Sequence, residues 1–224
     1  MKTNRNNVDL SALLEHENGR TLYEGQQGYV VCTQSGNTIM TDITDGAALH
    51  AVLCALALQN VESAVVKSRS AQRTVRELFG LVGSDVCTQW VYCMPEPPAQ
   101  PACDIRPLQP CHAPLAAAHY HLFEDTEPYI TSRIAAGRMW GVFDGGSLAG
   151  FIGTHVEGSM GILEVLPEYR RRGYGLALEQ FLIAWHLERG WTPFGHVIDG
   201  NEASIRLQKK AGLVCAELPT IWMY

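Results

Sequence analysis

One stretch decides the fold of this chain: Leu163-Glu164-Val165-Leu166-Pro167-Glu168-Tyr169-Arg170-Arg171-Arg172-Gly173-Tyr174-Gly175-Leu176-Ala177. The apolar run at 161–166 predicts a buried strand, and residues 174–189 repeat apolar side chains with helical spacing. The helix therefore begins directly after the strand, at Arg170-x-x-Gly173-x-Gly175. A helix that begins this way leaves its first backbone amides without partners and presents the positive end of its dipole.

This arrangement predicts a phosphate-binding loop. Gly173 and Gly175 would let the backbone approach a phosphate closely, and Arg170, Arg171 and Arg172 would add charged donors. The chain as a whole has 17 Lys and Arg against 23 Asp and Glu, a formal charge of -6. This balance disfavours nucleic acid or an anionic membrane as a partner, because both require a basic field. The predicted anion site is therefore local.

The rest of the second half predicts alternating helices and strands. Helices near 115–119 and 129–136 precede a hairpin with strands 140–143 and 148–154, and a strand at 194–198, a helix at 202–210 and a last strand ending at Tyr224 come after the long helix. In the long helix, Leu178, Phe181, Leu182 and Trp185 are spaced to form one buried stripe. We expect Asn201 to cap the helix at 202–210 and Gly212 to end it.

A proline-rich segment divides the chain. Seven of the 11 prolines fall between Pro95 and Pro114, a density that excludes a helix or a central strand. We therefore predict an N-terminal domain at 1–94, a linker at 95–104 and a C-terminal domain at 105–224. The first domain is expected to contain helices at 8–15, 47–58 and 70–79 and strands at 29–33, 38–43, 64–66 and 86–93.

The two halves share a weak internal repeat. Subtracting 132 from the numbers of the second half places Val197 on Val65, Ala203 on Ala71, Gly212 on Gly80, Leu213 on Leu81, Val214 on Val82, Trp222 on Trp90 and Tyr224 on Tyr92. The matches indicate either two copies of one strand-helix-strand unit or a chance similarity between two α/β segments. The first half has Asp42 and Asp45 before its corresponding helix, so we expect no phosphate site there.

The second half resembles the GNAT superfamily of acyl-CoA-dependent N-acyltransferases. The likeness covers roughly 105–224 and lies in Arg170-x-x-Gly173-x-Gly175 and in Asn201, Leu207, Gly212 and Leu213, with Ala203 displaced by one position. The stretches 166–170 and 195–203 look like the FR47-like branch, which includes the glycine N-acyltransferases. The resemblance implies an α/β fold with a mixed, splayed central sheet flanked by helices. The N-terminal half would be a degenerate GNAT-like domain.

The resemblance also implies where an acyl-CoA would bind. The fourth and fifth strands of the family splay apart, and pantetheine pairs there with the backbone at positions that correspond to Leu163 and Val165. The pyrophosphate would be held by Arg170, Arg171, Arg172, Gly173, Tyr174, Gly175 and Leu176. Asn201 would lie beside the pantetheine arm. The co-substrate would be acetyl-CoA or another acyl-CoA, with no metal.

The catalytic residues depart from the family pattern. The position of the usual glutamate base is Ser159, which cannot remove a proton unaided. The nearby carboxylates are Glu164, which we place first because it lies on the strand beside the expected thioester, and Glu157; His155 could relay a proton. The usual tyrosine acid is replaced by Gln208, so water, Tyr224 or another residue would protonate the thiolate, or no acid would be needed.

The resemblance implies an acyltransferase that acts by direct attack of a primary amine, and we expect a small-molecule amine as acceptor and acetyl-CoA as donor. Two alternatives stay open: amino-acid N-acylation with a larger acyl-CoA, and a non-catalytic acyl-CoA sensor. Glu124, Asp125 and Glu127 in the loop at 119–137 are compatible with a cationic acceptor. The oligomeric state is open, and a homodimer is one of its options.

Several features bear on compartment and metals. The seven cysteines contain no Cys-x-x-Cys pair and the N-terminus has no signal-peptide pattern, so we expect free thiols and a cytoplasmic location. The longest apolar stretch, 47–58, is too short to span a bilayer. Cys103, Cys111, His112, His119 and His121 match no compact zinc pattern, and we predict no metal site.

Overall fold

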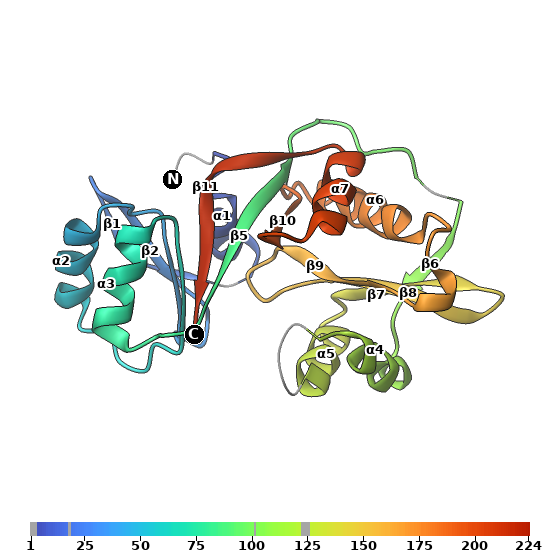
Figure 1. The fold of residues 1–224 in the computed structure, drawn as a ribbon, viewed down its shortest axis with the longest axis horizontal. Helices are drawn as coiled ribbons and strands as arrows, with labels where there is room; N and C mark the ends of the chain where they lie inside the picture. The colour runs from blue at the N-terminus through green and yellow to red at the C-terminus, as the bar shows by residue number, and fades with distance from the viewer. Residues whose placement is uncertain (1–3, 18, 101, 122–125) are drawn as a thin grey trace.

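The structure is a computed structural model that describes residues 4–17, 19–100, 102–121 and 126–224. Within these residues, strands and helices form a mixed α/β fold around one sheet of 11 strands, in the order β1-β2-β3-β4-β11-β5-β10-β9-β8-β7-β6 (Figure 1). The first half contains α1 (Val8–His16), β1 (Arg20–Gly25), β2 (Gly28–Cys32), β3 (Thr38–Thr41), α2 (Gly46–Leu56), β4 (Ser63–Val66), α3 (Arg69–Phe79) and β5 (Ser84–Tyr92). The second half contains β6 (Asp104–Pro107), η1 (Pro110–His112), α4 (Ala113–His119), α5 (Thr126–Ala135), β7 (Met139–Asp144), β8 (Ser147–Thr154), β9 (Met160–Val165), η2 (Pro167–Tyr169), α6 (Tyr174–Leu187), β10 (Phe194–Ile198), α7 (Glu202–Ala211) and β11 (Leu213–Met223).

The α/β fold class is confirmed, and the helices and strands expected from the sequence are present with bounds that shift by a few residues. Two further strands were not expected, β1 and β6, and they form the two edges of the sheet. β1 is exposed at both ends and so lacks a buried apolar run. β6 includes Pro107, which an edge strand tolerates because one side of its backbone has no strand partner.

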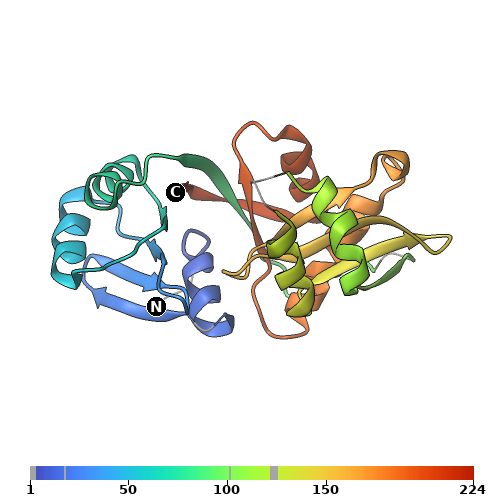
Figure 2. The ribbon, with the colours of Figure 1, turned by 90° about the horizontal axis from the view of Figure 1, so that it is seen from below.

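The last strand of each half is inserted into the sheet of the other half. β11 pairs antiparallel with β4, where Trp222 lies opposite Val65, and β5 pairs antiparallel with β10, where Thr88 lies opposite Val197. β5 and β11 also pair with each other and connect the two lobes seen in Figures 1 and 2. The division at 95–104 stays a prediction, and the sheet runs without interruption through both halves.

The exchange follows the internal repeat of the sequence. β4, α3 and β5 occur in the same order as β10, α7 and β11, and each set matches the other at an offset of 132 residues. Both middle helices end at a glycine with positive φ, Gly80 at 73° and Gly212 at 89°. The two sets therefore agree in element type, in order and in the glycine that ends the helix.

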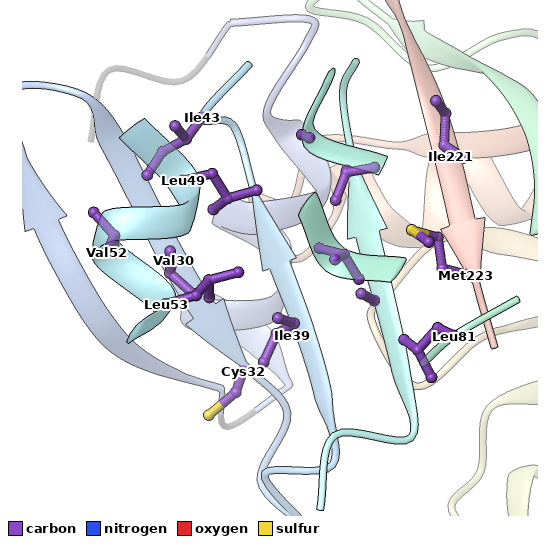
Figure 3. Packing of buried hydrophobic residues seen from close by; sticks show 14 residues of the cluster. Val30, Cys32, Ile39, Ile43, Leu49, Val52, Leu53, Leu81, Ile221 and Met223 are labelled. Carbon is purple, nitrogen blue, oxygen red and sulfur yellow. The ribbon is translucent and has the colours of Figure 1, made fainter. Parts of the chain in front are cut away.

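Exchanged residues complete the core of the N-terminal lobe. Leu49 and Leu53 of α2 pack on Val30 and Ile39 of the sheet, and Ile221 and Met223 of β11 belong to the same fully buried cluster (Figure 3). Burying one such side chain contributes about 1.5–3 kcal/mol. The N-terminal lobe therefore depends on the C-terminal end of the chain for part of its core.

The core of the C-terminal lobe contains the stripe predicted for α6. Leu178 and Leu182 are fully buried, and Phe181 and Trp185 pack at the margin of the same cluster. Trp140 of β7 lies close to both aromatic rings, 5.8 Å from Phe181 and 4.8 Å from Trp185 by ring centroid. α6 is thereby fixed against the sheet, which positions its N-terminus beside the end of β9.

A buried polar network lies where the two halves meet. Lys67, which follows β4, is 1% exposed and donates to Asp9 of α1 at 2.5 Å and to Thr220 of β11 at 3.0 Å. Gln89 of β5 accepts from Nε2 of His196 on β10 at 2.9 Å. The network joins both exchanged strands to α1, so it ties the two halves to each other.

Candidate functional site

A fork between two parallel strands forms the centre of the site. β9 and β10 are in register at one position, where Gly195 lies opposite Met160, and then diverge. The corresponding strands of the first half, β3 and β4, pair at three positions from Thr38–Ser63 to Met40–Val65. The second half therefore has an open strand edge that the first half lacks.

The backbone of β9 is irregular just beyond the point where the fork opens. Ile162 has a φ of 50°, and the register between β8 and β9 shifts between Phe151 and Gly153. A β-branched residue with positive φ is an outlier that costs of order 1–3 kcal/mol. Such strain is common at functional sites, and here it lies two residues beyond Met160, where the fork opens.

The predicted phosphate loop lies at the open end of the fork. η2 leads into it, Arg171 has a φ of 66°, and Gly173 caps α6 with a φ of 89°. The first helical bond runs from the amide of Ala177 to the carbonyl of Gly173, so among the described residues no acceptor binds the amides of 171–176. Nothing lies within 4 Å of the position that a Cβ on Gly173 would occupy. These features leave room for an anion above the helix N-terminus.

The three arginines of the loop differ in their contacts. Arg170 donates from Nε to the carbonyl of Val165 at 3.0 Å and from Nη2 to Oε1 of Glu164 at 3.0 Å. Arg172 donates to Oδ2 of Asp144 at 2.9 Å. Arg171 is exposed. All three guanidinium groups thus remain at the surface around the free amides.

The remaining residues expected to contact a co-substrate lie on the elements that form the fork. Leu163 and Val165 are half-buried on β9, beyond its pairing with β10. Val165 and Leu207 of α7 both lie within 4 Å of the position that a Cβ on Gly175 would occupy. Asn201 caps α7, where its Oδ1 accepts from the amide of Ser204 at 3.1 Å. The residues predicted to bind a co-substrate therefore converge on the fork and its loop.

The two candidate bases lie at opposite ends of β9. Glu164 is at the loop end, 30% exposed and paired with Arg170. Glu157 lies in the turn between β8 and β9, 3% exposed, and accepts a short hydrogen bond from the hydroxyl of Ser159. Burial raises the pKa of Glu157 to about 7, although the bond from Ser159 lowers it. Of the two, only Glu157 is hydrogen-bonded to Ser159, which directly precedes Met160, where the fork opens.

Side chains that the sequence did not single out hold this turn in place. Tyr129 of α5 lies with its hydroxyl 2.7 Å from Nδ1 of His155. Arg133, 7% exposed, donates from Nε to the carbonyl of Thr154 at 2.8 Å. Burial and Arg133 lower the pKa of His155 to about 4, so this imidazole is neutral at neutral pH. Tyr129 and Arg133 had no sequence signal beyond their place in an expected helix.

The N-terminal helix covers the same turn. A Cβ on Gly158 would lie 3.5 Å from both Ala12 and Glu17, and Glu17 pairs with Arg138 at 3.1 Å. These contacts place α1 and Glu17 of the first half beside the turn between β8 and β9. Of the acidic loop residues, Glu127 is exposed, whereas Glu124 and Asp125 lie outside the described residues.

Comparison with known proteins agrees with this geometry. Residues 107–213 match the sequence model of the acetyltransferase (GNAT) family. A search of curated protein sequences gives no match.

Several solved structures resemble most or all of the chain. A Drosophila protein is 22% identical with a TM-score of 0.67, over 88% of this chain and 73% of its own. A GNAT-family protein from Novosphingobium aromaticivorans is 18% identical with a TM-score of 0.59, over 96% and 94%. A GNAT acetyltransferase from Colwellia psychrerythraea is 12% identical with a TM-score of 0.55, over 100% and 98%. At these identities the likeness is one of fold.

The position of the usual GNAT acid is occupied by a buried pair. Gln208 of α7 donates from Nε2 to Oε1 of Glu179 on α6 at 2.9 Å, and both side chains are buried. Burial raises the pKa of Glu179 to about 7. Tyr224 lies at the far end of β11, roughly 30 Å along that strand from α7, with its hydroxyl on Asp85. Neither Gln208 nor Tyr224 thus offers a titrating proton at the fork between β9 and β10.

The described part of the chain contains no group of three or more His, Cys, Asp or Glu side chains placed to hold a metal ion. None of its helices is both long and apolar enough to cross a membrane. All seven cysteines are free thiols.

Proposed function

We propose that this GNAT domain transfers an acyl group, acetyl in the simplest case, from acyl-CoA to the primary amine of a small molecule. The observation that carries the proposal is the coincidence of an open strand fork with an arginine-rich helix N-terminus whose amides have no acceptor in the described part of the chain. The fork offers backbone groups to an extended amide chain, and the loop offers donors to a pyrophosphate. These are the two parts of coenzyme A that a protein must hold.

The residues present fit an acyl-CoA. The amides of 171–176 and the guanidinium groups of Arg170, Arg171 and Arg172 would hold the pyrophosphate, and the backbone of Leu163 and Val165 would pair with pantetheine. Gly173 leaves the space above the helix open, and Asn201 lies at the start of the helix that follows the second fork strand. Bound acyl-CoA supplies a thioester, which is an activated acyl donor.

The proton of the acceptor ammonium would pass to Glu157 by way of Ser159. Ser159 occupies the family's base position and already donates its hydroxyl proton to the Glu157 carboxylate. When Ser159 accepts a proton from the amine and passes its own to Glu157, the hydroxyl is restored and the carboxylate becomes neutral. A pKa of about 7 suits this task, because the base is partly ionised at neutral pH and still accepts a proton readily.

Glu164 is the weaker candidate for the base. It lies five residues from Ser159 along β9, roughly 15 Å away, and its carboxylate is paired with Arg170. In the proposed reaction no side-chain acid protonates the leaving thiolate, which is released at the open fork.

Two finer assignments extend the proposal. The FR47-like stretches at 166–170 and 195–203 favour small amines such as amino acids as acceptors. The replacement of the usual acid by Gln208, with Glu157 fully buried, favours an acyl-CoA sensor as the second candidate. Turnover with any amine would separate the enzyme from the sensor, since both would bind acyl-CoA.

The test is calorimetric titration of acetyl-CoA into the wild type, Gly173→Glu and Gly173→Ala. Both variants place a side chain at a φ of 89°, which costs about 1–2 kcal/mol, so Gly173→Ala is the control for backbone strain. Only Gly173→Glu puts a carboxylate where the pyrophosphate would lie. We expect binding by the wild type and Gly173→Ala and its loss in Gly173→Glu. Equal binding by all three proteins would contradict the proposal.

A further inference from the structure

The open edge of β9 is closed by side chains of the site itself. The amide of Leu166 donates to the carbonyl of Ala149 on β8, so alternation along the strand directs the amide and carbonyl of Val165 away from β8 and toward the fork. No strand of the described chain pairs with β9 on that side beyond Met160. Val165 nevertheless has a partner for each of its backbone groups.

Both partners come from one ion pair. The Val165 amide donates to Oε1 of Glu164 at 3.2 Å, and the Val165 carbonyl accepts from Nε of Arg170 at 3.0 Å. Arg170 Nη2 donates to the same Glu164 oxygen at 3.0 Å. The Val165 amide, the Glu164 carboxylate, the Arg170 guanidinium and the Val165 carbonyl form a closed ring of hydrogen bonds. Glu164 and Arg170 thus bind the backbone groups that a neighbouring strand would bind.

We propose that the Glu164–Arg170 pair is a latch that competes with acyl-CoA for the edge of β9 and so sets the affinity for the co-substrate. The inference rests on the proposed function. Pantetheine would require the Val165 amide and carbonyl, which the latch occupies, and the pyrophosphate would require Arg170, which the latch holds on the strand. Binding therefore requires that the latch open, with Arg170 moving from Glu164 to the phosphates.

The latch and the base are two different roles for Glu164, and they predict different effects of its removal on acyl-CoA binding. A base variant reacts slowly and binds acyl-CoA as before, whereas a latch variant binds acyl-CoA more tightly. The affinity of a protein with a closed and an open state is reduced by the fraction that is open. A salt bridge between half-exposed groups is weak, so the closed state is favoured by a modest factor, about threefold to fivefold.

The test compares Glu164→Ala with Asp144→Ala in calorimetric titration with coenzyme A. Asp144 pairs with Arg172 of the same loop at 2.9 Å but has no hydrogen bond to the backbone of β9. Each variant removes one negative charge that pairs with one arginine of the loop. The change in electrostatic attraction of the anionic coenzyme A is therefore the same in both variants. We expect Glu164→Ala to bind coenzyme A about threefold to fivefold more tightly than Asp144→Ala. Equal or weaker binding by Glu164→Ala would overturn the latch.

A second measurement needs no ligand. Amide hydrogen exchange at Val165 in the free protein should be faster in Glu164→Ala than in Asp144→Ala, because the Val165 amide loses its acceptor. Unchanged exchange would also overturn the latch. Failure of the proposed function gives a different result, since then neither the wild type nor either variant would bind coenzyme A.

Discussion

The ion pair between Asp9 and Lys67 should contribute strongly to stability, because it is buried where the two halves meet. The exposed fractions are 0% for Asp9 and 1% for Lys67, and the two charged atoms are 2.5 Å apart. Removing one partner of a buried pair leaves an uncompensated charge and costs about 3–5 kcal/mol. We therefore expect Asp9→Asn and Lys67→Met each to lose about that much free energy of unfolding.

The loss is large for a protein of this size. Typical domains are stable by about 5–15 kcal/mol, and in chains of 150–250 residues each kcal/mol shifts Tm by about 2–4 °C. Either single variant should thus unfold roughly 10 °C below the wild type. The double variant removes both charges together and should recover most of the loss, since a buried pair gains little over neutral side chains.

Urea denaturation followed by tryptophan fluorescence would measure these differences. Trp222 donates to Nδ1 of His196 at 3.3 Å beside the network and reports on the contact between the halves. Glu202→Gln is the control, because the Glu202–Arg206 pair is about 70% exposed and should change stability by less than about 0.5 kcal/mol. Single variants that lose less than about 1 kcal/mol, or a double variant no more stable than either, would refute the reasoning.

Two further predictions concern the buried carboxyl groups. The rate kcat/KM should rise with pH around a midpoint of about 7, where Glu157 ionises; Glu157→Gln should lower it by about 10²–10⁴-fold and remove this limb, whereas the exposed Glu188→Gln should keep it. A limb that survives in Glu157→Gln would assign the base elsewhere. Glu179 has a raised pKa, so its stabilising effect is complete below about pH 4.5 and is lost as pH rises through about 7. Relative to the wild type, Glu179→Gln should therefore gain about 3 kcal/mol of stability between about pH 4 and pH 8 in urea denaturation, and a constant difference would contradict the shift.

The sequence determined most of the local structure because local structure depends on near neighbours. The helical stripe of Leu178 and Leu182, the cap at Asn201 and the stop at Gly212 each follow from residues within a few positions, and all three are present. The loop at 170–175 was predictable for the same reason. The amides of the loop are free because the first amides of any helix have no acceptor within the helix. Gly173 lies where the backbone has a positive φ, which glycine adopts readily.

Tertiary structure decided how the halves combine. Nothing local to β5 or β11 shows that each completes the sheet of the other half, because both strands would be equally apolar in either place. The edge strands β1 and β6 were not predicted because an exposed edge strand has no continuous apolar run. In β6, Pro107 is as typical of a linker as of an edge strand.

Tertiary structure also separated the two candidate bases. In the sequence Glu157 and Glu164 are nearby carboxylates on either side of Ser159. The fold buries Glu157 against Ser159 and pairs Glu164 with Arg170. Burial and ion pairing depend on groups that are distant in sequence, such as α1 above the turn and the loop that returns Arg170 to β9. The sequence by itself could therefore specify the elements and the loop, whereas the environment of each carboxylate arose only when the chain was folded.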